Sequence, residues 1–212
     1  MAQISLFTTL ISWLTAWSGA ASMPAPERSR TADAQPPSPP PAQGRRIAWG
    51  ARVSPGFKRK TIAVAHRLRM DPDHLMAIMA FETGRSFDPA VTNLAGSGAT
   101  GLIQFMPATA RALGTTTAAL AGMTALDQLD YVEKYLAPHA GRIGDLPSAY
   151  MAVLYPRAVD KPSGFVLFRK GSKAYKLNRG LDVNSNGQVT KAEAAAKVSA
   201  LLEEGLRPGL IG

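Results

Sequence analysis

Cysteine is absent from the 212 residues, so disulfides cannot stabilise the fold and the sequence sets no constraint on the redox compartment. Acidic residues are few: 15 Asp and Glu stand against 24 Lys and Arg, which gives a formal net charge of +9. This excess suits an anionic partner, such as nucleic acid, acidic lipid or a polymer of the bacterial envelope. The basic residues are scattered and no nucleic-acid-binding motif is present, so we expect no nucleic-acid partner.

Charged side chains are also missing from the N-terminal segment, where none occurs from Ala2 to Pro26. Its apolar centre predicts an export signal or a membrane anchor over residues 1–22. Two features oppose this interpretation: no Lys or Arg precedes the apolar run, and Ser and Thr dilute it. A third interpretation is an amphipathic helix used in a larger assembly such as a phage particle. The protein could therefore associate with a membrane through this segment.

Residues 23–46 are rich in Pro, Ala and Ser. Such a composition buries too little apolar surface to offset its ordering entropy, so we predict a disordered, extended linker. The linker is either a tether that gives reach to the following domain or a solvated tail. The remaining length suits one globular unit, which we divide into a helical domain at 47–160 and an extension at 161–212 packed on it.

The segment from Asp71 to Met106 contains the most informative residues. Asp71 followed by Pro72 predicts a helix start, and Gly84 predicts its end. Apolar residues recur between them at helical spacing, on a face wide enough for a central helix: Leu75, Ala77, Ile78, Met79, Ala80 and Phe81. Glu82 ends this helix, where it is either a solvated terminal residue or a carboxylate in apolar surroundings. In the second case desolvation raises its pKa, as a general acid near neutrality requires.

Other helices are predicted around this one from N-capping residues and apolar periodicity. They begin at Ser54-Pro55 and at Asp145-Leu146-Pro147, and a third covers Thr124–His139. The short apolar run Phe165–Phe168 allows a small β hairpin. We therefore expect a mainly α fold.

Three short motifs resemble those of a known family. They are Phe81-Glu82-Thr83-Gly84, then Gly98-Ala99-Thr100-Gly101-Leu102-Ile103-Gln104-Phe105, then Ala149-Tyr150-Met151-Ala152. Together they resemble lytic transglycosylases of the soluble, goose-type-lysozyme-like (SLT) family, especially phage-encoded members, over roughly 57–156. The resemblance implies a lysozyme-like helical fold, peptidoglycan glycan strands as the partner, and a protein exported to the periplasm or cell wall, membrane-tethered, or carried in a phage particle.

A second catalytic carboxylate is missing from the sequence near Glu82. Only Asp88 lies between Glu82 and Asp127, and Asp88-Pro89 is typical of a turn. Inverting and double-displacement glycosidases both need two carboxylates, so a one-carboxylate mechanism is favoured. The resemblance implies that Glu82 acts as both acid and base in forming 1,6-anhydro-N-acetylmuramic acid. A lysozyme-type hydrolase and a non-catalytic wall-binding or calcium-binding module are the alternatives.

Residues expected to contact the sugar follow from the second and third motifs. Glycines there let the backbone approach a ligand closely, and the Gln104 amide offers a donor and an acceptor. Tyr150 either faces the sugar or belongs to the core. The family pattern has Ser where this chain has Ala95, and Asn where it has Met151. The predicted substrate-binding residues are Asn93, Ser97, Gly101, Gln104, Phe105 and Tyr150.

The C-terminal extension contains an EF-hand-like loop followed by a helix. Residues 182–193 fit D-x-[DN]-x-[DN]-G-x5-E, with Asp182, Asn184, Asn186 and Glu193 as the predicted metal ligands. Two observations oppose Ca²⁺: only two ligands are charged, and Lys173–Gly180 makes a poor entering helix. A competing interpretation needs no ion, because Thr190 and Glu193 fit a helix capping box. We expect no cofactor to be required for catalysis.

Overall fold

The computed structural model describes residues 44–93 and 96–212. The predicted signal or anchor at 1–22, nearly all of the predicted linker at 23–46, and Ala95 lie outside the described residues. No helix among the residues described is long and apolar enough to cross a membrane.

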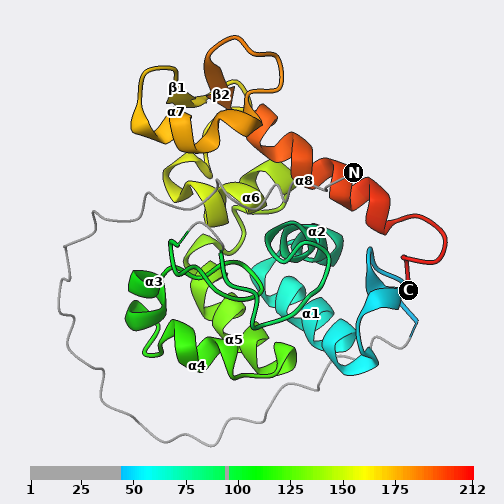
Figure 1. Ribbon diagram of the computed structural model, residues 1–212. Helices are drawn as coiled ribbons and strands as arrows, with labels where there is room; N and C mark the ends of the chain where they lie inside the picture. Colours follow the sequence, from blue (N-terminus) through cyan, green and yellow to red (C-terminus); the bar gives the residue numbers. More distant parts are fainter. Residues whose placement is uncertain (1–43, 94–95) are drawn as a thin grey trace, which may run out of the picture.

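Helices dominate the described part of the chain, and one two-stranded sheet accompanies them (Figure 1). The helices are α1 (Pro55–Leu68), α2 (Pro72–Glu82), α3 (Pro107–Ala112), α4 (Thr117–Ala121), α5 (Ala125–Leu136), α6 (Leu146–Leu154), α7 (Lys173–Asn178) and α8 (Lys191–Gly205). The strands are β1 (Val166–Arg169) and β2 (Gln188–Thr190). The predicted mainly α, lysozyme-like fold is therefore confirmed, and the Phe165–Phe168 run contributes a strand to a two-stranded sheet that is not a hairpin.

Helix α2 lies at the centre of the fold and packs against α1, α6 and α8. The Asp71 carboxylate accepts a hydrogen bond from the Asp73 backbone N–H at 2.9 Å, and Pro72 occupies the first turn, as predicted. Every residue from Leu75 to Ala80 is buried, so α2 lacks a solvent face over this stretch. This burial explains why its apolar residues surround the helix rather than forming one stripe.

Capping side chains begin the helices that surround α2. Ser54, Thr124 and Asp145 each accept a hydrogen bond from the first turn of α1, α5 and α6, respectively. The predicted starts of these three helices are therefore confirmed. Helix α4 was not predicted, because its five residues are too few to show a periodicity.

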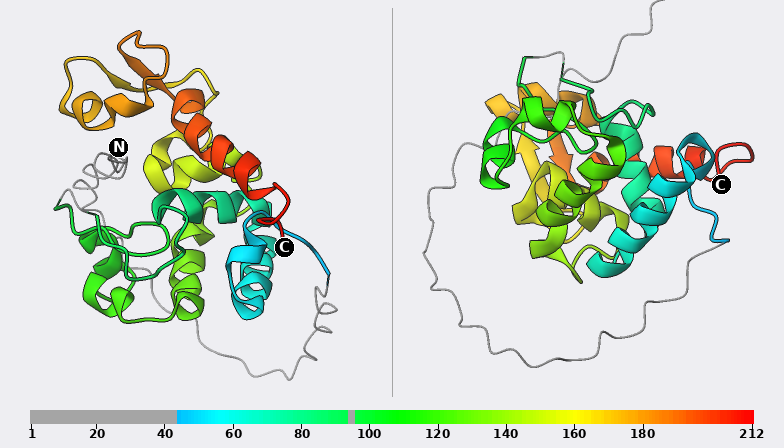
Figure 2. Two further views of the ribbon diagram at one scale, coloured as in Figure 1. Left: turned by 45° about the vertical axis from the view of Figure 1, so that its right-hand side comes forward. Right: turned by 90° about the horizontal axis from the view of Figure 1, so that it is seen from below.

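The C-terminal extension contributes to the same core. Helix α8 packs along α2 and α6 (Figure 2), and the Trp49 indole N–H donates to the Leu201 carbonyl at 2.9 Å. Gly205 passes so close to this indole that a Cβ atom there would lie 2.3 Å from Trp49 Nε1. Ile47 and Gly212 exchange two backbone hydrogen bonds. The segment before α1 and the C-terminal residue therefore meet beside α8.

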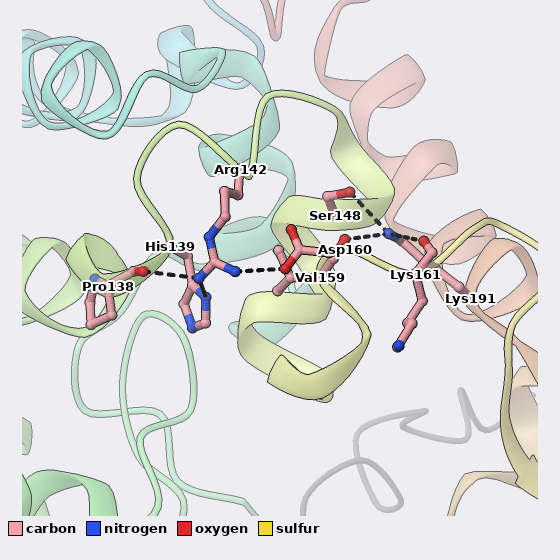
Figure 3. A network of polar contacts seen from close by, with 8 residues as sticks. All are labelled: Pro138, His139, Arg142, Ser148, Val159, Asp160, Lys161 and Lys191. Carbon is pink, nitrogen blue, oxygen red and sulfur yellow. Dashed lines mark hydrogen bonds and ion pairs between the residues drawn. The ribbon is translucent and has the colours of Figure 1, made fainter.

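Strands β1 and β2 pair antiparallel above α6. They are not joined by a tight turn, since α7 and the 182–187 loop separate them. Below the sheet, the buried ammonium of Lys191 donates to Ser148 Oγ at 3.0 Å and to the carbonyls of Val159 and Lys161 at 2.7 and 2.8 Å (Figure 3). These bonds fix the first turn of α8 to the start of α6.

Candidate active site

Glu82 is the last residue of α2, and its side chain is buried. Burial raises the pKa of the Glu82 carboxyl to about 8, because the ionised form loses solvation there. Among the described residues, none makes a hydrogen bond or ion pair with this carboxylate. The prediction of a desolvated carboxyl at the helix end is confirmed, and the interpretation as a solvated terminus is wrong.

Two tyrosines from different helices lie close enough to Glu82 for its charge to raise their pKa values. Burial, and secondarily the charge of Glu82, raise the pKa of Tyr135 on α5 to about 12 and raise the pKa of Tyr150 on α6 well above its usual value. The Tyr135 hydroxyl donates to the Ala152 carbonyl at 3.0 Å. The Tyr150 hydroxyl is fully buried and has no hydrogen-bond partner among the described residues. The sequence analysis predicted the helix that contains Tyr135 but named no site residue in it, and so missed this tyrosine.

The backbone after Glu82 is fixed by its own side chains. The Thr83 hydroxyl donates to the Met79 carbonyl at 2.6 Å and accepts from the Phe87 N–H at 3.0 Å. Arg85 binds both carboxylate oxygens of Glu204 on α8, at distances that include 2.6 and 2.9 Å. The end of α2 is therefore joined to the C-terminal helix, which the sequence did not reveal because the two residues lie 119 positions apart.

Asp88 has the turn role that its sequence context indicates. Its side chain is exposed, and Oδ1 accepts from the Ala90 N–H at 2.8 Å. No charged neighbour among the described residues contributes to the raised pKa of Glu82, which has burial as its cause.

The second motif forms a compact loop beside these residues. Thr100 and Phe105 exchange two backbone hydrogen bonds, and Gly101 N–H donates to the Val91 carbonyl at 2.8 Å. Gln104 has a positive φ of 53°, and its amide Nε2 donates to the carbonyls of Val91 and Gly101. Both N–H groups of this amide are thus used within the loop, so only its Oε1 remains for a sugar.

Gln128 on α5 holds the loop in place, and the sequence analysis missed it. Its Oε1 accepts from the Leu102 N–H at 2.6 Å, while Nε2 donates to the carbonyls of Pro89 and Leu120. The side chain is completely buried. In the sequence it stands among the charged residues of an amphipathic helix, where nothing marks it as the support of a distant loop.

The predicted substrate-binding residues differ in exposure. Tyr150, Phe105, Gln104 and Asn93 are buried, whereas Ser97 is partly exposed and its hydroxyl accepts from the Ala99 N–H at 3.3 Å. A shallow depression lies beside the loop, lined by Ile103, Gln104, Phe105, Met106, Thr109, Tyr135 and Val153. The structure thus brings Gln104 and Phe105 together with Tyr135, which joins this depression to the surroundings of Glu82.

The predicted metal loop lies far from this site in the sequence, between α7 and α8. The expectation that Lys173–Gly180 makes a poor entering helix is wrong: Lys173–Asn178 is helical because Ser172 Oγ accepts from the Tyr175 N–H at 3.0 Å. The predicted capping box between Thr190 and Glu193 is confirmed. Across the residues described, no three His, Cys, Asp or Glu side chains gather as a metal site.

Comparison with protein families gives one match. Residues 60–152 match the Transglycosylase SLT domain, a range that includes Glu82, the Gly101 loop and Tyr150. No curated protein and no solved structure matches the chain. This domain indicates a lytic transglycosylase that acts on the peptidoglycan of the cell wall. The match supports the placing of residues 60–152 in the SLT family of lytic transglycosylases.

Proposed function

We propose that the protein cleaves the β-1,4 bond between N-acetylmuramic acid and N-acetylglucosamine in peptidoglycan, with Glu82 as its single general acid and base. The observation that carries the proposal is the isolation of this group. Its carboxyl is buried, its pKa is about 8, and no second carboxylate of the described residues stands beside it.

In the first step Glu82 is the acid. With a pKa of about 8 it is mainly protonated at neutral pH, so it can donate its proton to the glycosidic oxygen as the bond from that oxygen to the muramoyl C1 breaks. The leaving N-acetylglucosamine departs as an alcohol. An oxocarbenium-like C1 and a Glu82 carboxylate remain.

In the second step Glu82 is the base. The carboxylate takes the proton of the muramoyl C6 hydroxyl, and O6 bonds to C1 and closes the 1,6-anhydro ring. The proton lost in the first step is thereby restored and no water is consumed. A double displacement would need an anionic nucleophile, and an inverting hydrolase would need a second base for water. The one-carboxyl site supports neither.

The positive charge that develops between these steps needs stabilisation without a protein anion. Fixed dipoles of the 98–105 loop and the substrate's own N-acetyl group are the available sources. The unpartnered Tyr150 hydroxyl is well suited to donate to the Glu82 carboxylate when this forms, because it is already dehydrated and close to it. Tyr150 would then control the basicity of Glu82 in the second step.

For substrate binding we retain the residues of the loop, with different roles. Gly101 and Gln104 shape the backbone, and Phe105 lines the depression with Tyr135. Asn93 and Ser97, which precede Gly101 in the chain, are proposed to contact an acetamido or hydroxyl group of the sugar. Tyr150 is buried, so its proposed role is to donate to Glu82 rather than to contact the sugar.

Positive charge on the extension supports an acidic wall polymer as the partner. Residues 161–181 contain no acid and six exposed cations: Lys161, Arg169, Lys170, Lys173, Lys176 and Arg179. The five ion pairs of the described structure include none of them. We name these six residues the basic segment and propose that it holds the carboxylate-bearing strand near the site.

The proposal extends to where the enzyme works. Residues 1–22 would direct export or anchor the chain, and residues 23–46 would give the domain reach to the wall, as in a phage lysis or entry protein. Comparing cell fractions for the full chain and for a chain starting at residue 44 tests this part separately. Equal distribution of the two would reject it.

Product analysis on purified sacculi tests the chemistry. We expect muramic ends lighter by one water than reducing ends, and no release with Glu82→Gln. Glu203→Gln, the same substitution at an exposed position on α8, is the matched control and should retain activity. Reducing ends would identify a lysozyme-type hydrolase instead, and binding of sacculi without release by the unmodified protein would identify a non-catalytic module.

A further inference from the structure

Glu193, in the first turn of α8, has one carboxylate oxygen without a partner. Its Oε2 accepts from the Thr190 N–H at 2.9 Å and from Thr190 Oγ1 at 2.8 Å, which holds the carboxylate against the last residue of β2. Its Oε1 is buried and has no hydrogen-bond partner among the described residues, and only 9% of the residue is exposed. A buried carboxylate oxygen of this kind is costly unless a donor or a cation satisfies it.

Other side-chain oxygens of the same loop accept hydrogen bonds from backbone N–H groups of the loop and of the strand that follows it. The Asp182 carboxylate accepts from the Asn186 and Gly187 N–H groups at 3.1 and 2.9 Å. Asn184 Oδ1 accepts from the Asn186 N–H at 3.0 Å, and Asn186 Oδ1 accepts from the Gln188 N–H at 2.8 Å. Each amide oxygen has two lone pairs and uses one here, so both retain acceptor capacity.

We propose that the 182–193 loop binds Ca²⁺ through side-chain oxygens of Asp182, Asn184, Asn186 and Glu193 and the backbone carbonyl of Gln188. The donors are all oxygens, which suit Ca²⁺ and not Zn²⁺. Their spacing is that of the EF-hand loop, in which the twelfth residue supplies a carboxylate. The Glu193 oxygen that lacks a partner stands at this twelfth position.

The affinity of this site is weak on electrostatic grounds. Only Asp182 and Glu193 bring negative charge, and the basic segment precedes the loop directly. Two charges place the site with extracellular calcium modules, for which the dissociation constant is about 0.1 to 1 mM. This range suits a protein that works outside the cytoplasm, where Ca²⁺ reaches such concentrations.

Binding should stabilise the whole folded domain and not the loop alone. Helix α8 starts directly after the loop and packs along α2 and α6, and Lys191 joins its first turn to Ser148. An ion that fixes the loop therefore favours the folded state of this packed unit. Its melting temperature is the readout, and it is independent of catalysis.

The decisive variant is Glu193→Gln. A glutamine keeps the capping box, because its amide oxygen still accepts from Thr190, but it removes the charge and one carboxylate oxygen. Asn184→Ala removes a single ligand from an exposed position and gives a second test should Glu193→Gln fold poorly. Glu203→Gln is the matched control on the same helix.

Melting in EGTA and in 10 mM Ca²⁺, about ten times the upper dissociation constant, tests the proposal. We expect Ca²⁺ to raise the melting temperature of the unmodified chain and of Glu203→Gln. The melting temperature of Glu193→Gln should not change with Ca²⁺, and that of Asn184→Ala should rise less than that of the unmodified chain. No shift in the unmodified chain, or an equal shift in Glu193→Gln, would overturn the site and leave the capping box as the role of Glu193.

Terbium luminescence tests independently whether the bound ion lies in the 182–193 loop. The Tyr175 hydroxyl donates to Asp182 Oδ2 at 2.6 Å, so a Tb³⁺ ion in the loop would lie beside a phenol that transfers excitation to it. We expect tyrosine-sensitised Tb³⁺ emission that Ca²⁺ suppresses and that Glu193→Gln loses. Emission from the unmodified chain that Ca²⁺ leaves unchanged would contradict the proposal.

Discussion

Gln128 occupies the space that a side chain at Gly101 would need. A Cβ atom at Gly101 would lie 2.3 Å from Gln128 Oε1, and the same oxygen accepts the Leu102 N–H that anchors the loop. Gly101 also has a φ of +87°, which residues with a Cβ rarely adopt. Glycine is therefore required at position 101 for two reasons: Gln128 on α5 leaves no space for a side chain, and the backbone has a positive φ.

Gly101→Ala should lower both stability and activity. Overpacking against a buried amide together with a strained φ costs about 2 to 4 kcal/mol in the free energy of unfolding. Denaturant melts and turnover on sacculi measure the two effects. Gly96→Ala is the matched control: φ there is +77°, but apart from its chain neighbours no atom of the described residues lies within 4 Å of the added methyl, so it should cost about 1 kcal/mol. Equal costs for both substitutions would show that Gln128 is not the obstacle.

Glu82→Gln should make the protein more stable than the unmodified chain at high pH. The folded pKa of about 8 lies above the ordinary value of 4.5, so the folded state binds more protons between these values. Stability of the unmodified chain is then highest below about pH 4.5 and falls as pH rises through 8. The substitution removes this loss, which is a few kcal/mol at most.

Melting temperatures of the two proteins from pH 5 to pH 9 measure this difference. They should be close at pH 5, and the difference should grow up to pH 8 in favour of Glu82→Gln. Glu203→Gln controls for loss of a negative charge and should show no such growth. A constant difference between Glu82→Gln and the unmodified chain would mean that Glu82 is ionised in the folded state at pH 5.

Sequence reasoning located Glu82 and its motifs because they are contiguous and depend on local chemistry. The Asp71 cap, the apolar run and the end of α2 are each visible within a dozen residues. The supports of the site are not contiguous: Gln128, Tyr135 and Glu204 reach it only through packing of helices distant in the chain. Helical periodicity places such residues on a face, but a single sequence does not reveal what that face meets.

The C-terminal extension shows the same limit. The capping box at Thr190 was predicted because its two partners are three positions apart. The role of α8 in the core was not, since it depends on Trp49 and Gly205, which are 156 residues apart and meet only in the fold.

Activity should fall on the alkaline side with an apparent pKa near 8. The first proposed step needs protonated Glu82, and the fraction protonated decreases tenfold per pH unit above its pKa. Initial rates on sacculi from pH 5 to pH 10 give the profile, at constant ionic strength because binding to an acidic polymer is salt-dependent. Glu203→Gln should show the same alkaline limb, and a loss of activity centred near pH 5 in both proteins would contradict a protonated Glu82 with a pKa of about 8 as the acid.

Tyr150→Phe separates a structural role from a chemical one. The Tyr150 hydroxyl is buried and unpartnered in the described structure, so its removal should leave stability unchanged or raise it by up to about 1 kcal/mol. The ring contact with Phe81, with centroids 5.6 Å apart, is kept. If the hydroxyl assists the Glu82 carboxylate, kcat should fall about tenfold or more with little change in KM, and the alkaline limb should move.

Tyr135→Phe is the comparison for this variant. It removes a hydroxyl whose bond to the Ala152 carbonyl is satisfied, so it should cost about 1 kcal/mol in stability. Loss of stability without loss of kcat in Tyr150→Phe would assign Tyr150 to the core.

Charge reversal in the basic segment should weaken binding to sacculi without altering the chemistry. Lys173, Lys176 and Arg179 are exposed and make none of the ion pairs described, so a triple substitution to Glu has little to break in the fold. It changes the local charge by six and should raise the KM for sacculi several-fold at low salt, with kcat kept. The difference should shrink as salt approaches 1 M, where the screening length is about 3 Å. Lys58, Arg59 and Arg69 on and after α1 provide a control triple with the same charge change on another face, and an equal effect there would mean that net charge, rather than the basic segment, governs binding.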